Sequence, residues 1–150
     1  MKPTPKGWPR VSCSLYYQDA SKAIDWLCKA FGFEVRLKVE GEGGRIEHSE
    51  LIVGSSTSGL GVVMVSEESR GQEKGRPAKS PKSIAGANTM NIMIYVDDAD
   101  AHCARARDAG GKITYEPKVS DYGEDYWADK SYEVEDLEGH RWWFAERVRG

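Results

Sequence analysis

The chain contains no long apolar run, and this absence sets the first limit on its class. A helix that crosses a bilayer needs roughly 20 consecutive apolar residues, and no stretch of the 150 residues approaches that length. Residues 1–6 also lack the apolar segment of a secretory signal. We therefore expect a cytoplasmic protein with no membrane partner.

Cysteine is scarce, and its spacing matches no cross-linked framework. Cys13, Cys28 and Cys103 are odd in number and form no C-x-x-C pair, which argues against both a disulfide framework and a zinc knuckle. None of them has an evident electropositive neighbour that would make it a nucleophile. We interpret all three as reduced thiols of the core.

Clustered basic residues and common catalytic signatures are absent as well. The net charge is −3 and the isoelectric point is about 5.7, whereas nucleic-acid binding depends on clustered Lys and Arg. We expect no nucleic-acid partner, and the slight acidity favours neutral or cationic ligands. The sequence has no G-x-x-x-x-G-K-S/T phosphate loop and no recognisable Ser-His-Asp context.

What the chain does contain is an internal repeat with a period of 79 residues. The repeated residues fall at a strand end, a helix cap and a helix stop, which are positions with a physical role. They are Tyr16, Asp19, Ala20, Ala30 and Gly32, which recur as Tyr95, Asp98, Ala99, Ala109 and Gly111. A repeat this long is not the short unit of a solenoid or propeller. The spacing predicts two copies of one unit within one domain.

Residues 10–66 are expected to form the first unit. Residues 11–17 alternate as a strand with two distinct faces would. Asp19 then caps a helix that Gly32 ends. Its apolar stripe consists of Ile24, Leu27, Cys28 and Phe31. Three β-branched stretches follow, at residues 35–39, 46–53 and 62–66. The order is βαβββ.

Residues 89–147 repeat that order and form the second unit. The intervening residues 67–88 carry five basic and three acidic side chains without periodicity, which favours a solvated tether over a lid. The predicted fold class is therefore α+β. Two tandem βαβββ modules form curved mixed sheets around a cup-shaped cavity, and together they make one domain.

The local sequence at the unit boundaries resembles that of the vicinal oxygen chelate superfamily. This superfamily includes glyoxalase I, extradiol dioxygenases, fosfomycin-resistance enzymes and bleomycin-binding proteins. Residues 15–20 and 94–99 are similar to its strand-to-helix openings, and residues 136–143 are similar to its closing D-P-x-G hairpin. The likeness spans about residues 10–147. It supports a glyoxalase- or bleomycin-resistance-like fold and leaves the activity open.

In metal-dependent members, the resemblance implies one metal ligand from the first strand and one from the last strand of each unit. Those positions fall here on Ser12 and Met64 in the first unit and on Asn91 and Trp143 in the second. None of the four is His, Asp, Glu or Cys, the side chains that bind divalent cations. We therefore expect no metal and no other cofactor.

Metal-competent side chains do occur elsewhere, so a relocated site is an open alternative. The candidates are His48, Glu50, Asp129 and His140, and Glu50 and Asp129 are themselves 79 positions apart. Paired carboxylates near a sheet rim are more often solvated or bound to Arg, which is the interpretation we favour. His102, on the second predicted helix, is interpreted as a surface or core-edge residue rather than a base.

Strand alternation predicts a cup lining of aromatic and weakly polar side chains. The expected ligand-binding residues are Ser12, Ser14, Tyr16, Met64, Asn91, Met93, Tyr95, Trp127 and Trp143. Aromatic walls suit a planar organic ligand and attract cations, and the polar side chains would orient such a ligand. The alternative is that Trp143 and the methionines fill the space that a metal vacated.

These patterns favour a metal-free small-molecule binding protein of the glyoxalase and bleomycin-resistance type, which binds an aromatic or cationic compound without turnover. A metal-dependent lyase, isomerase or dioxygenase with relocated ligands is the alternative. A module that binds another protein through its edge strands or linker is a third possibility. The resemblance also implies a homodimer, although the sequence does not show whether the modules pair within one chain or between chains.

Overall fold

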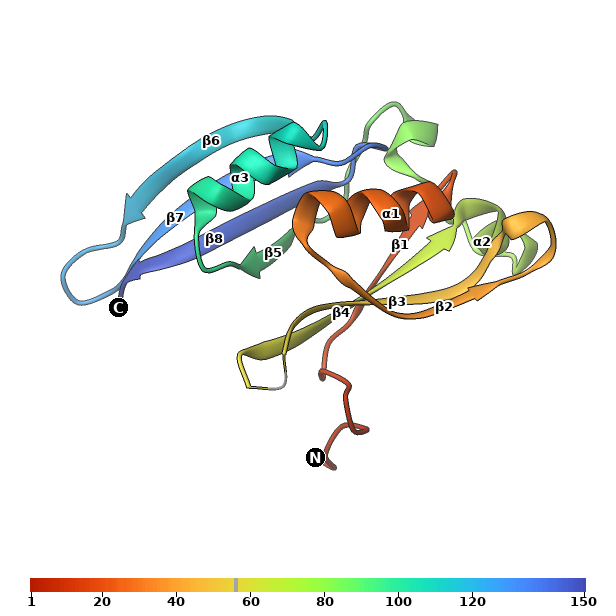
Figure 1. Cartoon of the computed structure of the whole chain (residues 1–150), viewed down its shortest axis with the longest axis horizontal. Coiled ribbons are helices and arrows are strands. Elements are labelled where there is room, and N and C mark those ends of the chain that lie inside the picture. Colours follow the sequence, from red (N-terminus) through yellow and green to blue (C-terminus); the bar gives the residue numbers. More distant parts are fainter. Residues whose placement is uncertain (56) are drawn as a thin grey trace.

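The computed structural model describes residues 1–55 and 57–150, which fold as two successive βαβββ modules (Figure 1). The first consists of β1 (Cys13–Tyr17), α1 (Ala20–Phe31), β2 (Glu34–Glu40), β3 (Ile46–Ser55) and β4 (Gly59–Glu67). The second consists of β5 (Ile92–Tyr95), α3 (Ala99–Asp108), β6 (Lys112–Asp121), β7 (Ala128–Glu135) and β8 (Arg141–Arg149). The predicted α+β class and module order are confirmed.

Each module forms one four-stranded mixed sheet. Sheet 1 has the order β1-β4-β3-β2 and sheet 2 has the order β5-β8-β7-β6. In both sheets the first strand runs parallel to the last, and the other pairs are antiparallel. A helix covers one face of each sheet, and we call the opposite face the cup face. The two sheets are not closed on one another within the chain.

Local sequence explains where the helices begin and end. The Asp19 side chain accepts a hydrogen bond from the Lys22 backbone N–H at 2.9 Å, and Asp98 accepts one from the Ala101 N–H at 2.9 Å. These carboxylates satisfy donors that a helix start leaves free. Helix α1 ends at Gly32, which adopts the left-handed conformation with φ 74°.

The two helices hold the modules together by capping each other. The Arg105 guanidinium of α3 donates to the Lys29 and Cys28 carbonyls at the end of α1, at 2.7 and 3.0 Å. The Trp26 indole of α1 donates in return to the Ala109 carbonyl at 2.9 Å. Carbonyls at a helix end lack a partner within the helix, although the Cys28 carbonyl also accepts from the Gly32 backbone N–H at 3.1 Å. The modules are therefore fixed to one another through their helices rather than through their cup faces.

His102 lies at this junction, at the edge of the core. Its Nε2 lies 3.1 Å from the Phe31 carbonyl oxygen and its Nδ1 lies 2.6 Å from the Tyr132 hydroxyl. Since a carbonyl only accepts, Nε2 carries the proton and Nδ1 accepts from the tyrosine. Burial lowers the pKa of His102, partly opposed by the hydrogen bond to Phe31. The neutral imidazole of His102 therefore makes both hydrogen bonds.

The segment between the modules is not the solvated tether that its composition predicts. It contains α2 (Glu68–Glu73) and the short 3₁₀ helix η2 (Pro81–Ile84). Ser80 is fully buried, and its hydroxyl donates to Glu138 at 2.5 Å while its N–H donates to Glu68 at 2.8 Å. The prediction was wrong because these polar contacts join residues far apart in sequence, which composition does not reveal.

The turn between β7 and β8 connects the two modules. The Asp136 carboxylate accepts from the Tyr17 hydroxyl at 2.6 Å, the Trp142 indole at 3.1 Å, and the backbone N–H groups of Glu138 and His140 at 3.0 Å each. Burial and the negative charge of Asp136 raise the pKa of Tyr17 well above its ordinary value. The phenol therefore remains a donor.

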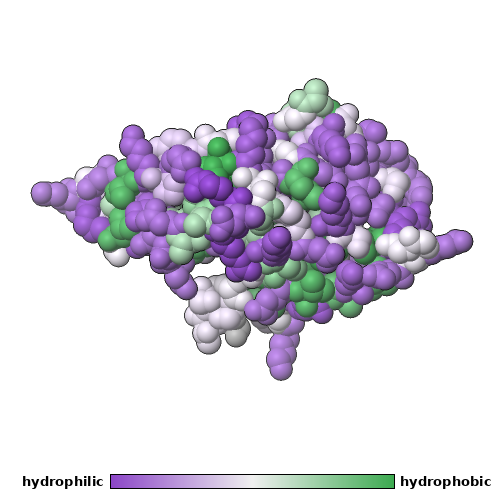
Figure 2. All heavy atoms as spheres, turned by 45° about the horizontal axis from the view of Figure 1, so that its top comes forward, coloured by the Kyte–Doolittle hydropathy of each residue, from purple (hydrophilic) through white to green (hydrophobic). Residues whose placement is uncertain are grey.

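The longest helix, α1, has 12 residues, and none of the helices in the described part of the chain is long and apolar enough to cross a bilayer. The face seen in Figure 2 is mostly hydrophilic, with hydrophobic residues in small separate groups.

Candidate functional site

The cup face of sheet 2 carries several exposed aromatic side chains. Along β8 the side chains alternate, so that Trp142 and Phe144 are buried on the helix-covered face while Trp143 lies on the cup face. Trp143 pairs in register with Met93 of β5, and its ring lies 5.5 Å from that of Tyr115 on β6. Between them, Glu133 of β7 lies in register with both Trp143 and Tyr115, so the surface combines aromatic side chains with one carboxylate.

These side chains remain open to solvent in the single chain. Met93 is 57% exposed, Tyr95 50%, Tyr115 39% and Trp127 42%. Scattered apolar residues are ordinary on protein surfaces, but a contiguous group on one sheet face is not.

Arg147 organises one end of the same face. Its guanidinium pairs with Asp129 at 2.5 Å and donates to the Tyr95 hydroxyl at 2.7 Å, and that hydroxyl donates to Asp129 at 3.1 Å. The guanidinium carbon also lies 5.2 Å from the centre of the Trp127 ring. The hydrogen bond to Asp129 raises the pKa of Arg147.

Sheet 1 has a similar carboxylate–arginine pair at Glu50, which is 79 positions before Asp129. Glu50 accepts from Arg36 at 2.8 Å and lies 2.9 Å from His48 Nε2. The hydrogen bond from His48 and the Arg36 guanidinium lower the pKa of Glu50, against the opposing effect of burial. Trp8, from the N-terminal segment, lies over Arg36 at 4.5 Å. Each sheet therefore presents a carboxylate, an arginine and an indole.

The residues at the family's metal-ligand positions do not fit a divalent cation. In register, Met64 lies beside Ser14 on sheet 1, and Trp143 lies beside Met93 on sheet 2. A thioether is a weak donor, and an indole N–H has no lone pair to give. Ser12 and Asn91 add only neutral oxygen donors, which do not compensate for the missing anions.

The candidates for a relocated metal site are not brought together. His48 and Glu50 contact each other, Asp129 lies on the other sheet, and the His140 Nε2 donates to the Tyr16 carbonyl at 2.9 Å at the module junction. Among residues 1–55 and 57–150, no three potential ligands form a cluster. Both carboxylates are bound to arginine, as favoured from sequence.

The structure divides the predicted cup residues between two hollows and two sheet faces. An open groove of about 1030 Å³ is lined by Ser12, Asn91, Met93 and Tyr95. A smaller cavity of about 290 Å³ is lined by Ser14 and Tyr16. Met64, Trp127 and Trp143 line neither of them. A single chain therefore does not gather the predicted residues around one cavity.

Sequence reasoning missed four contributors to these surfaces. Tyr115 and Arg147 follow the same strand alternation that placed Trp143, so the pattern could have found them. Arg36 lies at a register shift between β2 and β3, which breaks the alternation. Trp8 comes from an irregular segment, and no sequence signal indicates where it packs.

Comparisons with known proteins agree with this architecture. The family model described as Glyoxalase/Bleomycin resistance protein/Dioxygenase superfamily matches residues 10–144. An uncharacterized protein of Mycobacterium tuberculosis strain H37Rv is 30% identical over 141 residues, which cover 94% of this chain and 76% of that protein.

Solved structures show the same fold. TioX from Micromonospora sp. ML1 is 27% identical with a TM-score of 0.62, covering 91% of this chain and 98% of that one. TnmS3 from Streptomyces sp. CB03234, described as an antibiotic binding protein, is 18% identical with a TM-score of 0.60, covering 96% and 100%. The family model matches residues 10–144 of the 150 residues, so the chain belongs to the Glyoxalase/Bleomycin resistance protein/Dioxygenase superfamily.

Proposed function

We propose that the protein binds a planar aromatic compound on the cup face of sheet 2, without a metal and without turnover. The observation that carries this proposal is the exposed aromatic and apolar surface that Met93, Tyr95, Tyr115 and Trp143 build from three strands. Contiguous exposed apolar surface of this kind is typical of a ligand or partner site.

The chemistry of the face suits a flat ligand. Aromatic rings offer offset-stacked and edge contacts over a large area, and Arg147 next to Trp127 adds a planar guanidinium that stacks in the same way. The exposed loop residues Glu124 and Asp125 border this end of the sheet. They would favour a ligand that also carries a cationic group.

The comparisons support a small-molecule ligand in general terms. TnmS3, which shares the fold, is described as an antibiotic binding protein. Together with the poor fit of Ser12, Met64, Asn91 and Trp143 to a cation, this favours binding over metal-dependent turnover.

A second copy of the chain is the partner that would close the cup. Sheet 1 also exposes apolar side chains on β2, since Leu37 is 41% and Val39 is 42% exposed. Sheet 1 of one copy set against sheet 2 of another would cover both surfaces and enclose a ligand. Sedimentation velocity should then give a homodimer, and a strictly monomeric protein that still binds ligand would contradict this part of the proposal.

A titration of tryptophan emission tests the binding site. Proflavine, a planar aromatic cation, should quench the emission, whereas cyclohexylammonium should not. Trp143→Ala should lose the quench, and Trp26→Phe, which changes an indole at the helix junction, should keep it. Equal quenching in both variants would contradict the site. No response to a broad panel of planar cations, anions and neutral compounds would contradict the function.

The alternative is a lyase, isomerase or dioxygenase that uses a relocated metal, and the contact between His48 and Glu50 is the observation in its favour. A metal there would have to displace Arg36 from Glu50. Elemental analysis decides between the two functions. Stoichiometric zinc, nickel, manganese or iron that is lost in Glu50→Ala or Asp129→Ala would replace the binding proposal with this one.

A further inference from the structure

A second hollow, separate from the aromatic face, lies at the junction of the modules and the linker. This junction cavity of about 290 Å³ is close in size to the smaller pockets that hold organic ligands. Strand β1, residues 77–90 and the start of β8 supply its walls. Neither Met93 nor Trp143 lines it.

The linker wall of the junction cavity is fixed in place. Buried Ser80 is bonded to Glu68 and Glu138, next to the lining residue Lys79. Further along, the Asn88 amide donates to the Gly139 carbonyl at 2.8 Å. The wall is thus bonded at both ends to other parts of the fold, and the cavity is a built feature of the chain.

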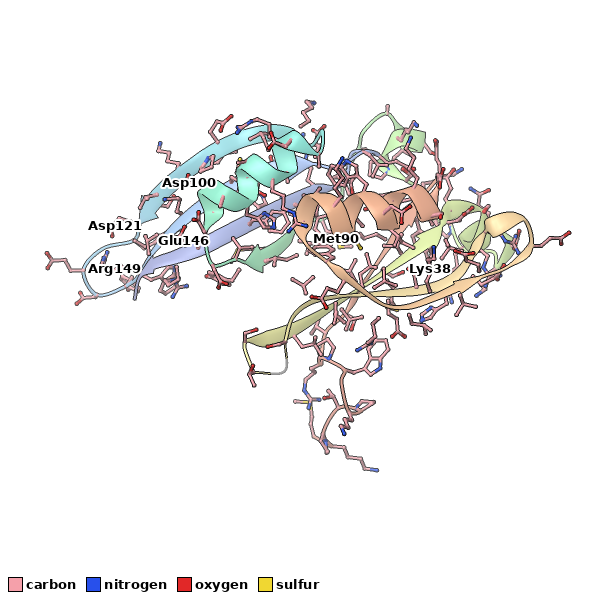
Figure 3. The ribbon with its side chains drawn as sticks, in the orientation of Figure 1. Lys38, Met90, Asp100, Asp121, Glu146 and Arg149 are labelled. Carbon is pink, nitrogen blue, oxygen red and sulfur yellow. The ribbon has the colours of Figure 1, made fainter. Side chains whose placement is uncertain are left out.

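The walls combine apolar surface with positive charge. Ile84 and Met90 supply apolar contacts, and they are still 41% and 55% exposed. Figure 3 labels Met90 between the two modules. An occupant that covered these two side chains would gain hydrophobic free energy.

The charged groups that line the cavity are cations. Lys79 and Arg141 both line it, and no Asp or Glu is among its described lining residues. Arg141 shares its charge with Glu133 and Glu135 at 3.6 and 3.2 Å, whereas Lys79 forms no ion pair within the described part of the chain. The segment 67–88 has a net charge of +2 in a chain of net charge −3. Burial raises the pKa of Glu68, and the hydrogen bonds from Ser80 and Ser83 together with the Lys79 charge lower it, so a carboxylate already offsets part of the Lys79 charge. The remaining positive charge at the lining favours an anion.

We infer that the junction cavity binds a small carboxylate with a compact apolar body. The carboxylate lies at Lys79 and Arg141, where it gains charge-assisted hydrogen bonds, and the body packs against Ile84 and Met90. This ligand has the opposite charge to the one favoured on sheet 2. The two sites are therefore chemically distinct.

Calorimetric titration with phenylacetate tests the inference, with phenylacetamide as the neutral match. Phenylacetate should bind at least tenfold more tightly than phenylacetamide. Lys79→Gln, which keeps most of the side-chain length and removes the charge, should weaken phenylacetate binding about tenfold, while the exposed helix variant Lys22→Gln should leave it unchanged. Ala87→Trp, at the exposed rim of the cavity, should block binding without removing a charge.

Other results of these titrations would contradict carboxylate binding in the junction cavity. Equal affinity for the acid and the amide, or equal weakening by Lys79→Gln and Lys22→Gln, would overturn the role of Lys79. Loss of phenylacetate binding in Trp143→Ala would place the ligand on sheet 2 instead. No phenylacetate binding to the folded wild-type protein would overturn the inference, and it would leave the proflavine result on sheet 2 unaffected.

Discussion

The last hairpin of each module has the same place in the fold and a different role. In the first module, Ser55, Thr57 and Ser58 are exposed, and their hydroxyl groups bond mainly to one another. In the second module, Asp136 is buried and accepts hydrogen bonds from Tyr17 of the first module. The two modules therefore share one topology, but of these two turns, only that between β7 and β8 forms hydrogen bonds that connect the modules in the described part of the chain.

The largest expected effect comes from Asp136→Ala. It leaves the Tyr17 hydroxyl, the Trp142 indole and two backbone N–H groups without their acceptor. Because buried unsatisfied donors cost about 1–3 kcal/mol each, the loss of the acceptor for four donors should lower the free energy of unfolding by at least about 4 kcal/mol in urea titrations. Asp136→Asn, which keeps one acceptor oxygen, should lose less, and a loss below about 1 kcal/mol in the alanine variant would refute the role of this turn in connecting the modules.

Two repeat-related glycines offer the next comparison. Gly32 has a left-handed backbone, with φ 74°, and a Cβ there would lie 2.7 Å from Arg105 Nη1, the movable end of a long side chain. A Cβ on Gly111 would instead lie 2.9 Å from the Ala106 carbonyl oxygen, which is backbone, and 2.9 Å from Val134. Gly111→Ala should cost about 2 kcal/mol through overpacking, and Gly32→Ala about 1 kcal/mol through backbone strain. The opposite order in chemical denaturation would show that the close approach at Gly111 is misassigned.

A smaller, pH-dependent effect is expected at the helix junction. Because burial lowers the pKa of His102, the unfolded chain takes up its proton first as the pH falls below about 6.5. The hydrogen bonds of the neutral ring therefore stabilise the fold at pH 7, and their contribution declines toward pH 5. The stability difference between the wild type and His102→Asn should shrink over this range, and a difference independent of pH would contradict the assignment.

The smallest effect should come from Ser58→Ala, the counterpart of the Asp136 change in the first module. Its hydroxyl accepts from the Ser55 N–H at 3.0 Å in an exposed turn. Water replaces such a partner, so unfolding should change by less than about 0.5 kcal/mol. A loss comparable to that of Asp136→Ala in the same urea titration would show that the two hairpins do not differ in the way proposed.

Sequence patterns predict most of the elements because each element follows from local spacing. The apolar stripe of α1 and the caps Asp19 and Asp98 are read within a few residues, and the structure places both helices there. The structure of the linker, residues 67–88, could not be predicted from local spacing. Helices α2 and η2 are short and polar, and the burial of Ser80 depends on Glu138, 58 positions away.

The candidate site could be predicted only in part, because strand alternation is a local pattern and the docking of the modules is not. Alternation places Met93, Tyr95 and Trp143 on one face of sheet 2, since side chains two residues apart share a face. What that face meets depends on how the modules dock. The docking rests on contacts such as Arg105 to the α1 carbonyls, for which no local pattern exists. Charged positions are equally hidden: Asp121 and Arg149 pair at the ends of β6 and β8 (Figure 3).

The indole N–H signals of the five tryptophans give the most direct test of the central claim, that an aromatic ligand binds the cup face of sheet 2. In a proton–nitrogen spectrum titrated with proflavine, the Trp143 and Trp127 signals should shift, whereas those of Trp142, which is buried, and Trp26, which bonds to Ala109, should stay. Shifts at Trp26 and Trp142 with none at Trp143 would contradict the account.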